Sequence, residues 1–407
     1  MELELINRFE EELKEQFKII DDIALFNQNK VLNAFKELKI SARHFNGTTG
    51  YGYGDDGRDS LNLLFAKVFG GEKAIVSPNI TCGTHALSTV LFGLLRPGDK
   101  ILSITGDPYD TLMDCINKSE KDLGTLKDFN IDFEKVELVN GKFDLDKIKT
   151  QLNNINPKIV YIQRSRGYQD RDALSIDIIK NICNYLRSIK ENIIIYIDNC
   201  YGEFVEKQEP LEVGADIIAG SLIKNPGGSI APTGGYIVGK EDLIEKVSCR
   251  YTNPSLKLEV GSYEMGYRLF YQGLFLAPHI VACAIKGSLL LSKTMEYLGF
   301  KTIPHSNERS YDIIRSLYFN DKDKMIKFCK LVQSLSPVDS YVTPEPWDMP
   351  GYNEQVIMAA GCFVAGSSIE LSCDGPVKPP YIVYFQGGIT YEHIKIVCLN
   401  LLKEINN

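Results

Sequence analysis

The chain of 407 residues is acidic, with 45 lysines and arginines against 53 aspartates and glutamates and a formal net charge of −8. Its apolar content of 44% and charged content of 24% are typical of a globular protein, and its length favours two lobes. The charge and the lack of a basic block argue against nucleic acid or an anionic membrane surface as a partner.

The first 57 residues predict a helical arm followed by a glycine-rich loop. Residues 1–40 carry apolar side chains at helical spacing, among them Leu5, Phe9 and Leu13. This acidic segment is unlike a secretory or transit peptide, and no apolar run approaches the roughly 20 residues of a membrane helix. The ten cysteines show no CxxC pair or metal-ligand spacing. We therefore expect a cytoplasmic protein with reduced thiols and no metal site.

The loop HFNGTTGYGYGDDGRDS at 44–60 matches the dinucleotide pattern G-x-G-x-x-G by its letters. No strand precedes it, and Asp55 and Asp56 inside the loop would repel a pyrophosphate. A dinucleotide site at this loop is not expected.

Between residues 58 and 285, short apolar runs alternate with helical patterns, of which 84–95 and 175–190 are the clearest. The runs are continuously apolar, which is typical of a parallel sheet covered by helices on both faces. The direction of the last strand stays open. The expected strands are 74–79, 100–105, 135–139, 158–163, 192–198, 215–221 and 234–239.

Residues 286–407 predict a smaller α+β domain. A long helical stretch around 261–298 leads into it, a proline-rich connector lies at 336–352, and a final strand is expected near 381–385. The fold class is thus α/β, with a mostly parallel large domain at 58–285 and a small carboxyl-terminal domain.

Lys224 is unusual because it follows an apolar stretch, 215–223, that predicts a buried strand ending in a Gly-Ser turn. Burial disfavours the ammonium form of lysine, and a neutral amine is what a Schiff-base lysine needs. Ligands of an open parallel sheet bind at the carboxyl ends of its strands, where Lys224 is expected. The residue therefore indicates an enzyme that uses pyridoxal phosphate (PLP).

Asp198 ends the apolar run NIIIYID at 192–198. A carboxylate there is costly unless it pairs with a cation, and a protonated pyridine nitrogen is such a cation. An acid at this nitrogen keeps the ring able to act as an electron sink. Taken alone, a helix cap or an ion pair with an arginine explains Asp198 equally well. Lys224 at the end of the next strand favours the pyridine partner.

The turn TCGTHA at 81–86 leads into a helix, so the free amides of Gly83, Thr84 and His85 would face an anion such as the cofactor phosphate. An ordinary threonine-capped helix is the alternative, and for His85 a capping, ring-contact or acid-base role stays open. Ser221 precedes Lys224 by three residues, so its hydroxyl can reach the same phosphate. We include Cys82 of this turn among the candidate cofactor-binding residues.

Tyr109 lies just past a strand end, where its ring can stack on the pyridine, although a tyrosine in a surface turn fits as well. The run QRSR at 163–166 also follows a strand. Its two arginines, Arg164 and Arg166, fit pairing with acids or with a substrate carboxylate better than binding of nucleic acid.

Together these residues resemble the bacterial aluminium resistance protein family, which is related to methionine gamma-lyase and the cystathionine lyases. The resemblance extends from about residue 45 to near the end of the chain. It is carried by motifs that include TGYGYGDDGRD, CGTHAL, GDPYDTL, IQRSRGY, DNCYGEFVE, GSLIKNPGGSIAPTGGY, QGLFLAPH and PYIVYFQGG.

The resemblance implies a PLP enzyme of fold type I that forms a homodimer or homotetramer with active sites shared between subunits. It makes Lys224 the lysine that binds the cofactor and acts as a base, Asp198 the partner of the pyridine nitrogen and Tyr109 the stacking ring. Gly83, Thr84 and Ser221 become phosphate contacts. A Tyr-x-Arg of the wider group, which reaches the neighbour's phosphate, corresponds only approximately to Tyr51, Tyr53 and Arg58.

The resemblance also implies elimination from a sulfur-containing amino acid, as carbon–sulfur lyases perform. The wider group holds the substrate carboxylate with an arginine in its last small-domain strand, whereas PYIVYFQGG has none. Arg164, Arg166 or Arg309 is then expected to take that role. Alternatives are an aminotransferase- or aldolase-type PLP enzyme, or a PLP-binding stress-tolerance protein with weak catalysis.

Overall fold

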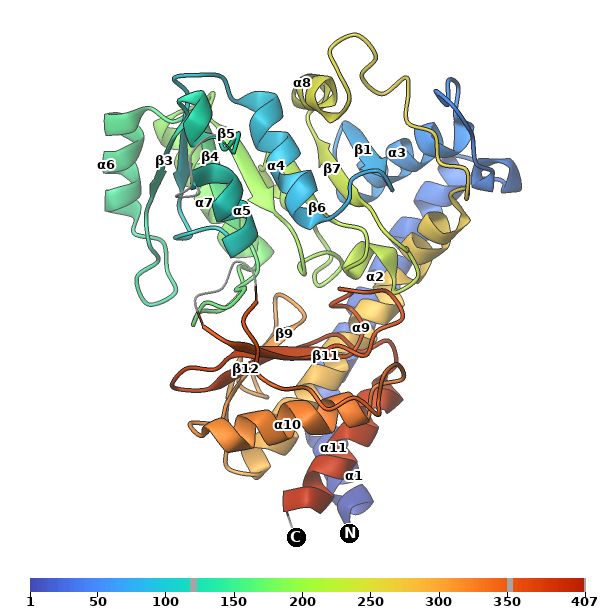
Figure 1. The fold of residues 1–407 in the computed structure, drawn as a ribbon, viewed down its shortest axis with the longest axis vertical. Helices are drawn as coiled ribbons and strands as arrows, with labels where there is room; N and C mark the ends of the chain where they lie inside the picture. The colour runs from blue at the N-terminus through green and yellow to red at the C-terminus, as the bar shows by residue number, and fades with distance from the viewer. Residues whose placement is uncertain (118–122, 350–353, 406–407) are drawn as a thin grey trace.

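A computed structural model of the protein describes residues 1–117, 123–349 and 354–405, and its two sheets form separate layers along a shared pair of long helices (Figure 1). The larger sheet has seven strands, which are, from one edge to the other, β1 (Lys73–Ser77), β7 (Gly235–Gly239), β6 (Ile217–Ser221), β5 (Ile194–Asp198), β4 (Ile159–Gln163), β2 (Lys100–Ser103) and β3 (Asp132–Lys135). Strand β7 runs antiparallel to both of its neighbours, whereas β6, β5, β4, β2 and β3 pair in parallel.

Helices cover both faces of this sheet because its strands are apolar on both sides. Along β4, Ile159 and Tyr161 belong to one buried cluster, and Val160 and Ile162 belong to the other. On one face lie α4 (Gly83–Leu94), α5 (Asp110–Asn117) and α8 (Glu241–Tyr251), and on the other α3 (Asp56–Phe69), α6 (Leu145–Ile155) and α7 (Ile176–Ile189). The mostly parallel, doubly covered sheet is therefore confirmed.

The smaller sheet is antiparallel throughout. Its five strands are, in spatial order, β10 (Val356–Ala359), β11 (Ser372–Pro376), β12 (Ile382–Gln386), β9 (Ile314–Tyr318) and β8 (Lys301–Ile303). It is accompanied by α10 (Lys322–Ser334) and α11 (Tyr391–Ile405). The final strand expected near 381–385 is thus present as β12.

The amino-terminal arm consists of α1 (Glu2–Glu12) and α2 (Lys14–Glu37), which pack along α9 (Arg268–Tyr297). Figure 1 shows α2 and α9 side by side, running from the large sheet towards the small one. The predicted boundary between residues 285 and 286 falls inside α9, so this helix belongs to the cores of both lobes.

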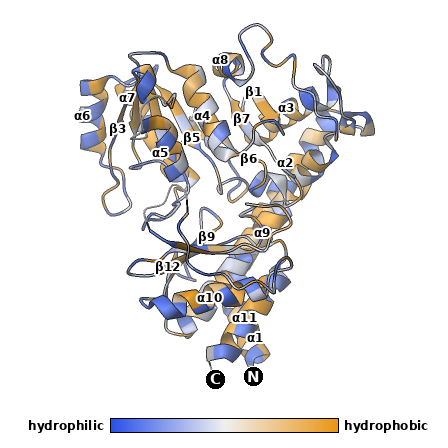
Figure 2. Ribbon diagram, viewed as in Figure 1, coloured by the Kyte–Doolittle hydropathy of each residue, from blue (hydrophilic) through white to orange (hydrophobic). Residues whose placement is uncertain are grey.

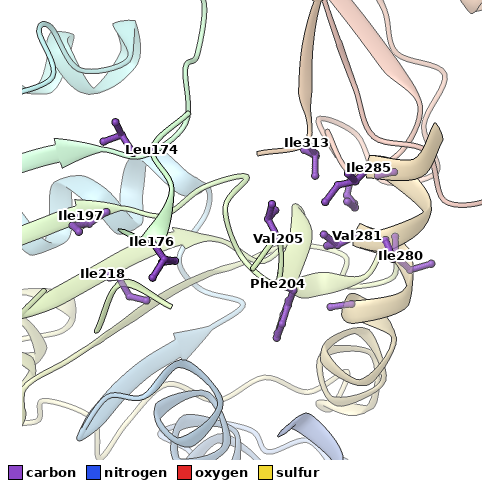
Figure 3. Close-up of a cluster of buried hydrophobic side chains, with 14 of the residues drawn as sticks. Leu174, Ile176, Ile197, Phe204, Val205, Ile218, Ile280, Val281, Ile285 and Ile313 are labelled. Atoms are coloured by element: carbon purple, nitrogen blue, oxygen red, sulfur yellow. The ribbon is translucent and has the colours of Figure 1, made fainter. Parts of the chain in front are cut away.

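Side chains of α9 meet the large lobe in the buried cluster of Figure 3. There Phe204 and Val205, from the loop after β5, lie between strand residues such as Ile197 and the α9 residues Val281 and Ile285. Figure 2 shows hydrophobic residues gathering along α9 and the strands. The loop after β5 is therefore held by apolar packing, which matters because it carries part of the site.

Two sequence expectations are wrong. The strand expected at 135–139 lies at 132–135, where it pairs with β2. It is a mostly exposed edge strand, so its sequence has no apolar pattern that marks its position.

Among the described helices, α9 alone is long and apolar enough to cross a membrane by length and composition, contrary to the expectation that no run approaches that length. Its most apolar window is 72% buried inside the protein, and core packing accounts for its composition.

Candidate active site

A cavity of about 350 Å³ lies where the carboxyl ends of the large-sheet strands face the small sheet. The ends of β4, β5 and β6 and the start of α4 form one side, and residues of β10, β11 and β12 form the other. The sheet edge is the one at which parallel sheets bind ligands. Of the candidates named from the sequence, Cys82, Gly83, Thr84, Tyr109, Asp198, Ser221 and Lys224 line this cavity.

Lys224 stands three residues beyond the end of β6, in the turn before Asn225–Gly227. Its Nζ lies 4.0 Å from the centre of the Tyr201 ring, which comes from the loop after β5. Tyr201 has a φ of 70°, and its hydroxyl lies 3.1 Å from Oγ of Ser368 in the small lobe. This unusual backbone turn places an aromatic ring against the lysine amine, where the quadrupole of the ring favours a cation.

The protonation expected for Lys224 is corrected by its surroundings. Burial lowers the pKa of the amine, as the sequence suggested, but Cys200, Tyr201 and Asp198 together raise it well above its ordinary value. Without a cofactor the surroundings of the lysine therefore favour its ammonium form.

Asp198 is buried and has no arginine partner within the described chain. Its carboxylate accepts hydrogen bonds from the backbone N–H of Cys200 at 3.0 Å and the hydroxyl of Tyr161 at 3.3 Å. Burial raises the pKa of this carboxyl, while Lys224 and the two hydrogen bonds lower it. Hydrogen bonds thus orient this carboxylate, and no arginine pairs with it within the described chain. It is therefore suited to a cationic partner such as a pyridinium nitrogen.

The hydroxyl of Ser221 is buried and has no hydrogen-bond partner. It faces the start of α4, since a Cβ atom on Gly83 would lie only 3.3 Å from Ser221 Cβ. The free amides of a helix start together with an unpaired hydroxyl make a cradle for an anion. These groups fit an anion, and phosphate binding at them stays a prediction.

Tyr109 and Thr84 are held at the same end of the cavity. The backbone N–H of Tyr109 donates to Oε1 of Gln163 at 2.8 Å, and Oγ1 of Thr84 lies 2.6 Å from Oγ1 of Thr111. Tyr109 is 37% exposed and lines the cavity. Stacking of its ring on a cofactor stays a prediction.

Cys82 and His85 have structural tasks in the turn before α4. The Sγ of Cys82 accepts from the backbone N–H of His85 at 3.3 Å, as a helix cap does. The Nδ1 of His85 accepts from the backbone N–H of Thr81 at 3.1 Å, and this residue does not line the cavity. Of the roles left open for His85, the structure favours capping.

The expectation that Arg164 or Arg166 holds a substrate carboxylate is corrected. Neither lines the cavity, and both are fully buried. Arg164 Nη1 donates to Asn199 Oδ1 at 2.8 Å, and its guanidinium pairs with Glu206 and Glu209 at 3.2 and 3.6 Å. Arg166 lies 3.5 Å from Asp312 and donates to the Ile303 carbonyl at 2.8 Å.

Both arginines are therefore committed to buried acids, the alternative weighed from the sequence. Arg309 also lies away from the cavity, 3.8 Å from Glu206.

Tyr51 and Tyr53 lie on the surface, 65% and 61% exposed, and stack on each other with ring centres 5.3 Å apart. Neither lines the cavity of its own chain. Arg58 is buried against the same loop, where its Nη1 donates to the carbonyl of Gly52 at 2.9 Å. Completion of a neighbouring subunit's site by this loop stays a prediction.

Sequence reasoning missed the small-lobe wall of the cavity. Its residues Ser368, Ser372, Asp374 and Gln386 line the cavity opposite Tyr168 and Tyr201 of the large lobe. One signal was present, since SCDGP places an aspartate within a short strand-like run where an acid is unexpected. The others needed the packing of the two sheets, which no spacing in the sequence reveals.

The comparisons with known proteins identify the family of the chain. The sequence model of the methionine gamma-lyase family matches residues 2–406. The uncharacterized protein YnbB of Bacillus subtilis strain 168 is 48% identical over 380 residues, covering 93% of this chain and 90% of its own length. The L-methionine gamma-lyase of Pseudomonas putida is 24% identical over 266 residues, or 64% of this chain and 57% of that enzyme.

Solved structures match over almost the whole chain. A carbon–sulfur lyase involved in aluminium resistance from Clostridium novyi NT is 51% identical with a TM-score of 0.95, covering 99% of this chain and 96% of its own. A Listeria monocytogenes protein, provisionally named a cystathionine beta-lyase involved in aluminium resistance, is 47% identical with a TM-score of 0.97 and covers 99% and 100%.

The PLP-dependent protein YhfS of Escherichia coli shares the fold at 15% identity, with a TM-score of 0.63 and coverage of 95% of this chain and 96% of its own. The fold-type I architecture expected from the sequence is confirmed. From the match over residues 2–406, this chain belongs to the methionine gamma-lyase family.

Proposed function

We propose that the protein binds PLP in the cavity at Lys224 and catalyses an elimination that breaks a carbon–sulfur bond of an amino acid. The observation that carries the cofactor is the buried, unpaired hydroxyl of Ser221, which faces the start of α4 three residues before Lys224. Asp198 supplies the second anchor, an oriented carboxylate without a guanidinium partner. The residues present fit the anionic and the basic ends of PLP.

The protein's own groups have distinct tasks in this reaction. When bound, PLP supplies an electron sink for the pair released as a bond to Cα breaks. Lys224 is the attachment point, and its amine takes the Cα proton. Asp198 holds the proton at the ring nitrogen, the α4 amides and Ser221 bind the phosphate, and Tyr109 covers the ring.

The overall reaction balances without a further oxidant or reductant. The Cα proton passes to Lys224, and the carbon–sulfur bond breaks with its electron pair leaving on sulfur, which then takes a proton. Water releases the remaining fragment as a 2-keto acid and ammonia. Family membership and the names of close structural relatives support sulfur as the leaving atom.

An absorbance spectrum tests the cofactor. The purified protein should show a visible PLP band that disappears in Lys224→Ala after dialysis. A colourless wild-type protein that gains no band with added PLP would overturn the assignment. Incubation of the yellow protein with cystathionine, cysteine and methionine then tests the reaction, since release of a keto acid together with a thiol or sulfide is expected. A requirement for an amino acceptor would instead indicate transamination.

A further inference from the structure

The cavity lacks a fixed cation for the substrate. Among the described residues that line it, Lys224 is the only one with a basic side chain. In the proposed function that lysine is committed to the cofactor. The arginines once expected to bind substrate, Arg164 and Arg166, are paired elsewhere. Within the described chain, the wall that faces Lys224 from the small lobe therefore carries no cation of its own.

That wall is one face of the small sheet. Side chains alternate along a strand, so Ser372 and Asp374 of β11 share a face. Ser372 is paired with Gln386 of β12, and Asp374 with Tyr384, and all four line the cavity. The intervening Cys373 and Phe385 belong to the apolar core, although Cys373 also reaches the cavity. The polar residues are thus presented to the cavity by the register of two neighbouring strands.

Asp374 brings a carboxylate to this wall. It is 7% exposed, accepts from Gln386 Nε2 at 3.3 Å, and accepts from the hydroxyl of Tyr168. Burial raises the pKa of its carboxyl to about 6, so the group is mainly ionised at neutral pH. Of the described residues, Lys224 alone acts on it as a positive charge. The hydrogen-bond partners of this carboxylate are neutral, so a cation bound beside it is still favoured.

Unpaired hydroxyls stand in the same wall. The Oγ atoms of Ser372 and Ser367 are buried without a hydrogen-bond partner, and their residues are 6% and 1% exposed. Buried polar atoms usually have a hydrogen-bond partner, and both hydroxyls belong to residues that line the cavity, so they are available to a group bound there. Ser372 lies two residues from Asp374, on the same face, and can accept a hydrogen bond beside the carboxylate.

A second cavity beside this wall is acidic as well. It has a volume of about 310 Å³ and shares Tyr109, Tyr168 and Tyr384 with the first. Three carboxylates and one ammonium line it, namely Asp107, Asp110, Glu354 and Lys378, and Asp107 pairs with Lys135. The remaining excess of carboxylates favours cations over anions.

We propose that Asp374 and Ser372 bind an ammonium group at the far end of the substrate. The preferred substrate is then an amino acid thioether that carries a second protonated amine beyond the sulfur. This inference rests on the proposed function and narrows it. The plain side chain of methionine would leave Asp374 without its partner.

A matched pair of thioethers tests the inference. S-(2-aminoethyl)cysteine and S-propylcysteine have side chains of the same length, ending in an ammonium and a methyl group respectively. The wild-type holoenzyme should prefer the ammonium compound on the order of thirtyfold in kcat/KM. The reason is that its ammonium pairs with the buried Asp374 carboxylate, whereas the methyl group of the other compound leaves that charge unpaired. Asp374→Asn should reduce the preference to a few-fold, and Ser372→Ala should reduce it in part.

The control is Asp172→Asn, which removes a negative charge from an aspartate with a 65% exposed side chain in the same loop as Tyr168. This variant should prefer the ammonium compound as strongly in kcat/KM as the wild type does. Equal kcat/KM values for the two compounds in the wild type would refute the inference, and so would an unchanged preference in a folded Asp374→Asn.

Failure of the proposed function gives a different result. If neither thioether releases keto acid and thiol, the lyase assignment fails, and affinity then decides the inference separately. Both compounds are then titrated by calorimetry into the wild-type protein, which in this case consumes neither. Tighter binding of the ammonium compound, lost in Asp374→Asn, supports the binding site, whereas equal affinities reject it.

Discussion

At the scale of single residues, three buried carboxylates have raised pKa values, and two of them, Asp198 and Asp374, line the cavity. Burial raises the pKa of Asp198, of Asp374 to about 6, and of Glu203 to about 8. Their neighbours differ, since Asp198 is oriented towards the cofactor position, Asp374 faces the substrate space, and Glu203 accepts from the Tyr236 hydroxyl at 2.7 Å. Burial therefore raises the pKa of all three carboxyls, and the neighbours of each one decide its role.

Asp198→Asn should fold normally but lose nearly all turnover and bind PLP more weakly. The amide retains the shape of the side chain but no longer carries the charge that keeps the ring nitrogen protonated. The checks are circular dichroism, PLP retention on dialysis and keto-acid release. Unchanged turnover would remove Asp198 from this role.

Glu203 should make folding stability fall as pH rises. Its pKa in the folded protein, about 8, lies above the ordinary value of 4.5, so between these values the folded state keeps a proton that the unfolded chain releases. The stability present below pH 4.5 is thus lost progressively up to about pH 8. In Glu203→Gln, the decrease in the free energy of unfolding between pH 5 and pH 8 should be smaller by roughly a few kcal/mol. Thermal unfolding at the two pH values measures this difference.

Glu191→Gln, at an exposed position, is the control and should leave the difference between pH 5 and pH 8 unchanged. If Glu203→Gln has the same pH dependence as the wild type, Glu203 is not the group that titrates.

At the scale of elements, the site is built from the ends of β5 and β6 and the start of α4. Parallel pairing places the end of β5 beside β6, with Asp198 next to Ala219. The start of α4 then meets Ser221 through the small Gly83. Each element contributes one group, and the pairing of the strands brings these groups together.

Ser221→Ala should weaken PLP binding roughly tenfold without destabilising the cofactor-free protein. The lost hydroxyl has no partner in the protein, so its only expected contribution is to the ligand. Equilibrium dialysis measures the affinity, and thermal unfolding without PLP measures the stability.

Ser165→Ala is the matched control, because Ser165 also lines the cavity but donates to Asp312 at 2.9 Å. It should lower stability by about 1 kcal/mol and alter PLP affinity little. If Ser221→Ala behaved in the same way, its hydroxyl would be a structural group.

At the scale of the whole molecule, the cavity exists only because two sheets are held face to face. Asp312, just before β9, accepts from Ser165 Oγ and pairs with Arg166 at 3.5 Å, both of which follow β4. The Tyr201 hydroxyl reaches Ser368 across the same gap. These contacts set the position of the small-lobe wall relative to Lys224.

Asp312→Ala should destabilise the protein by about 3–5 kcal/mol, because it leaves the guanidinium of Arg166 buried without its partner. Thermal unfolding checks this. Asp172→Ala removes the other acid near Arg166, at 3.7 Å and with a 65% exposed side chain, and should have an effect below about 1 kcal/mol. Equal effects of the two changes would contradict the assigned role of Asp312.

The large lobe was largely predictable because its signals are local. Continuously apolar strands, the helix patterns at 84–95 and 175–190, and the polar residues after Ile159–Gln163 and Ile194–Asp198 all follow from neighbours in the chain. Asp198, Ser221 and Lys224 were therefore found as candidates. The small sheet was mostly missed, because its short antiparallel strands have no comparable pattern.

The sequence by itself determined the class of fold, the strand ends that carry chemistry and, through its motifs, the family. Only the tertiary structure decided which of those residues meet. It assigned Arg164 and Arg166 to buried acids, reversed the expected charge of Lys224, and set Asp374 opposite it. The reason is physical, since charge and hydrogen bonding depend on neighbours in space, and the two sheets bring together residues more than a hundred positions apart.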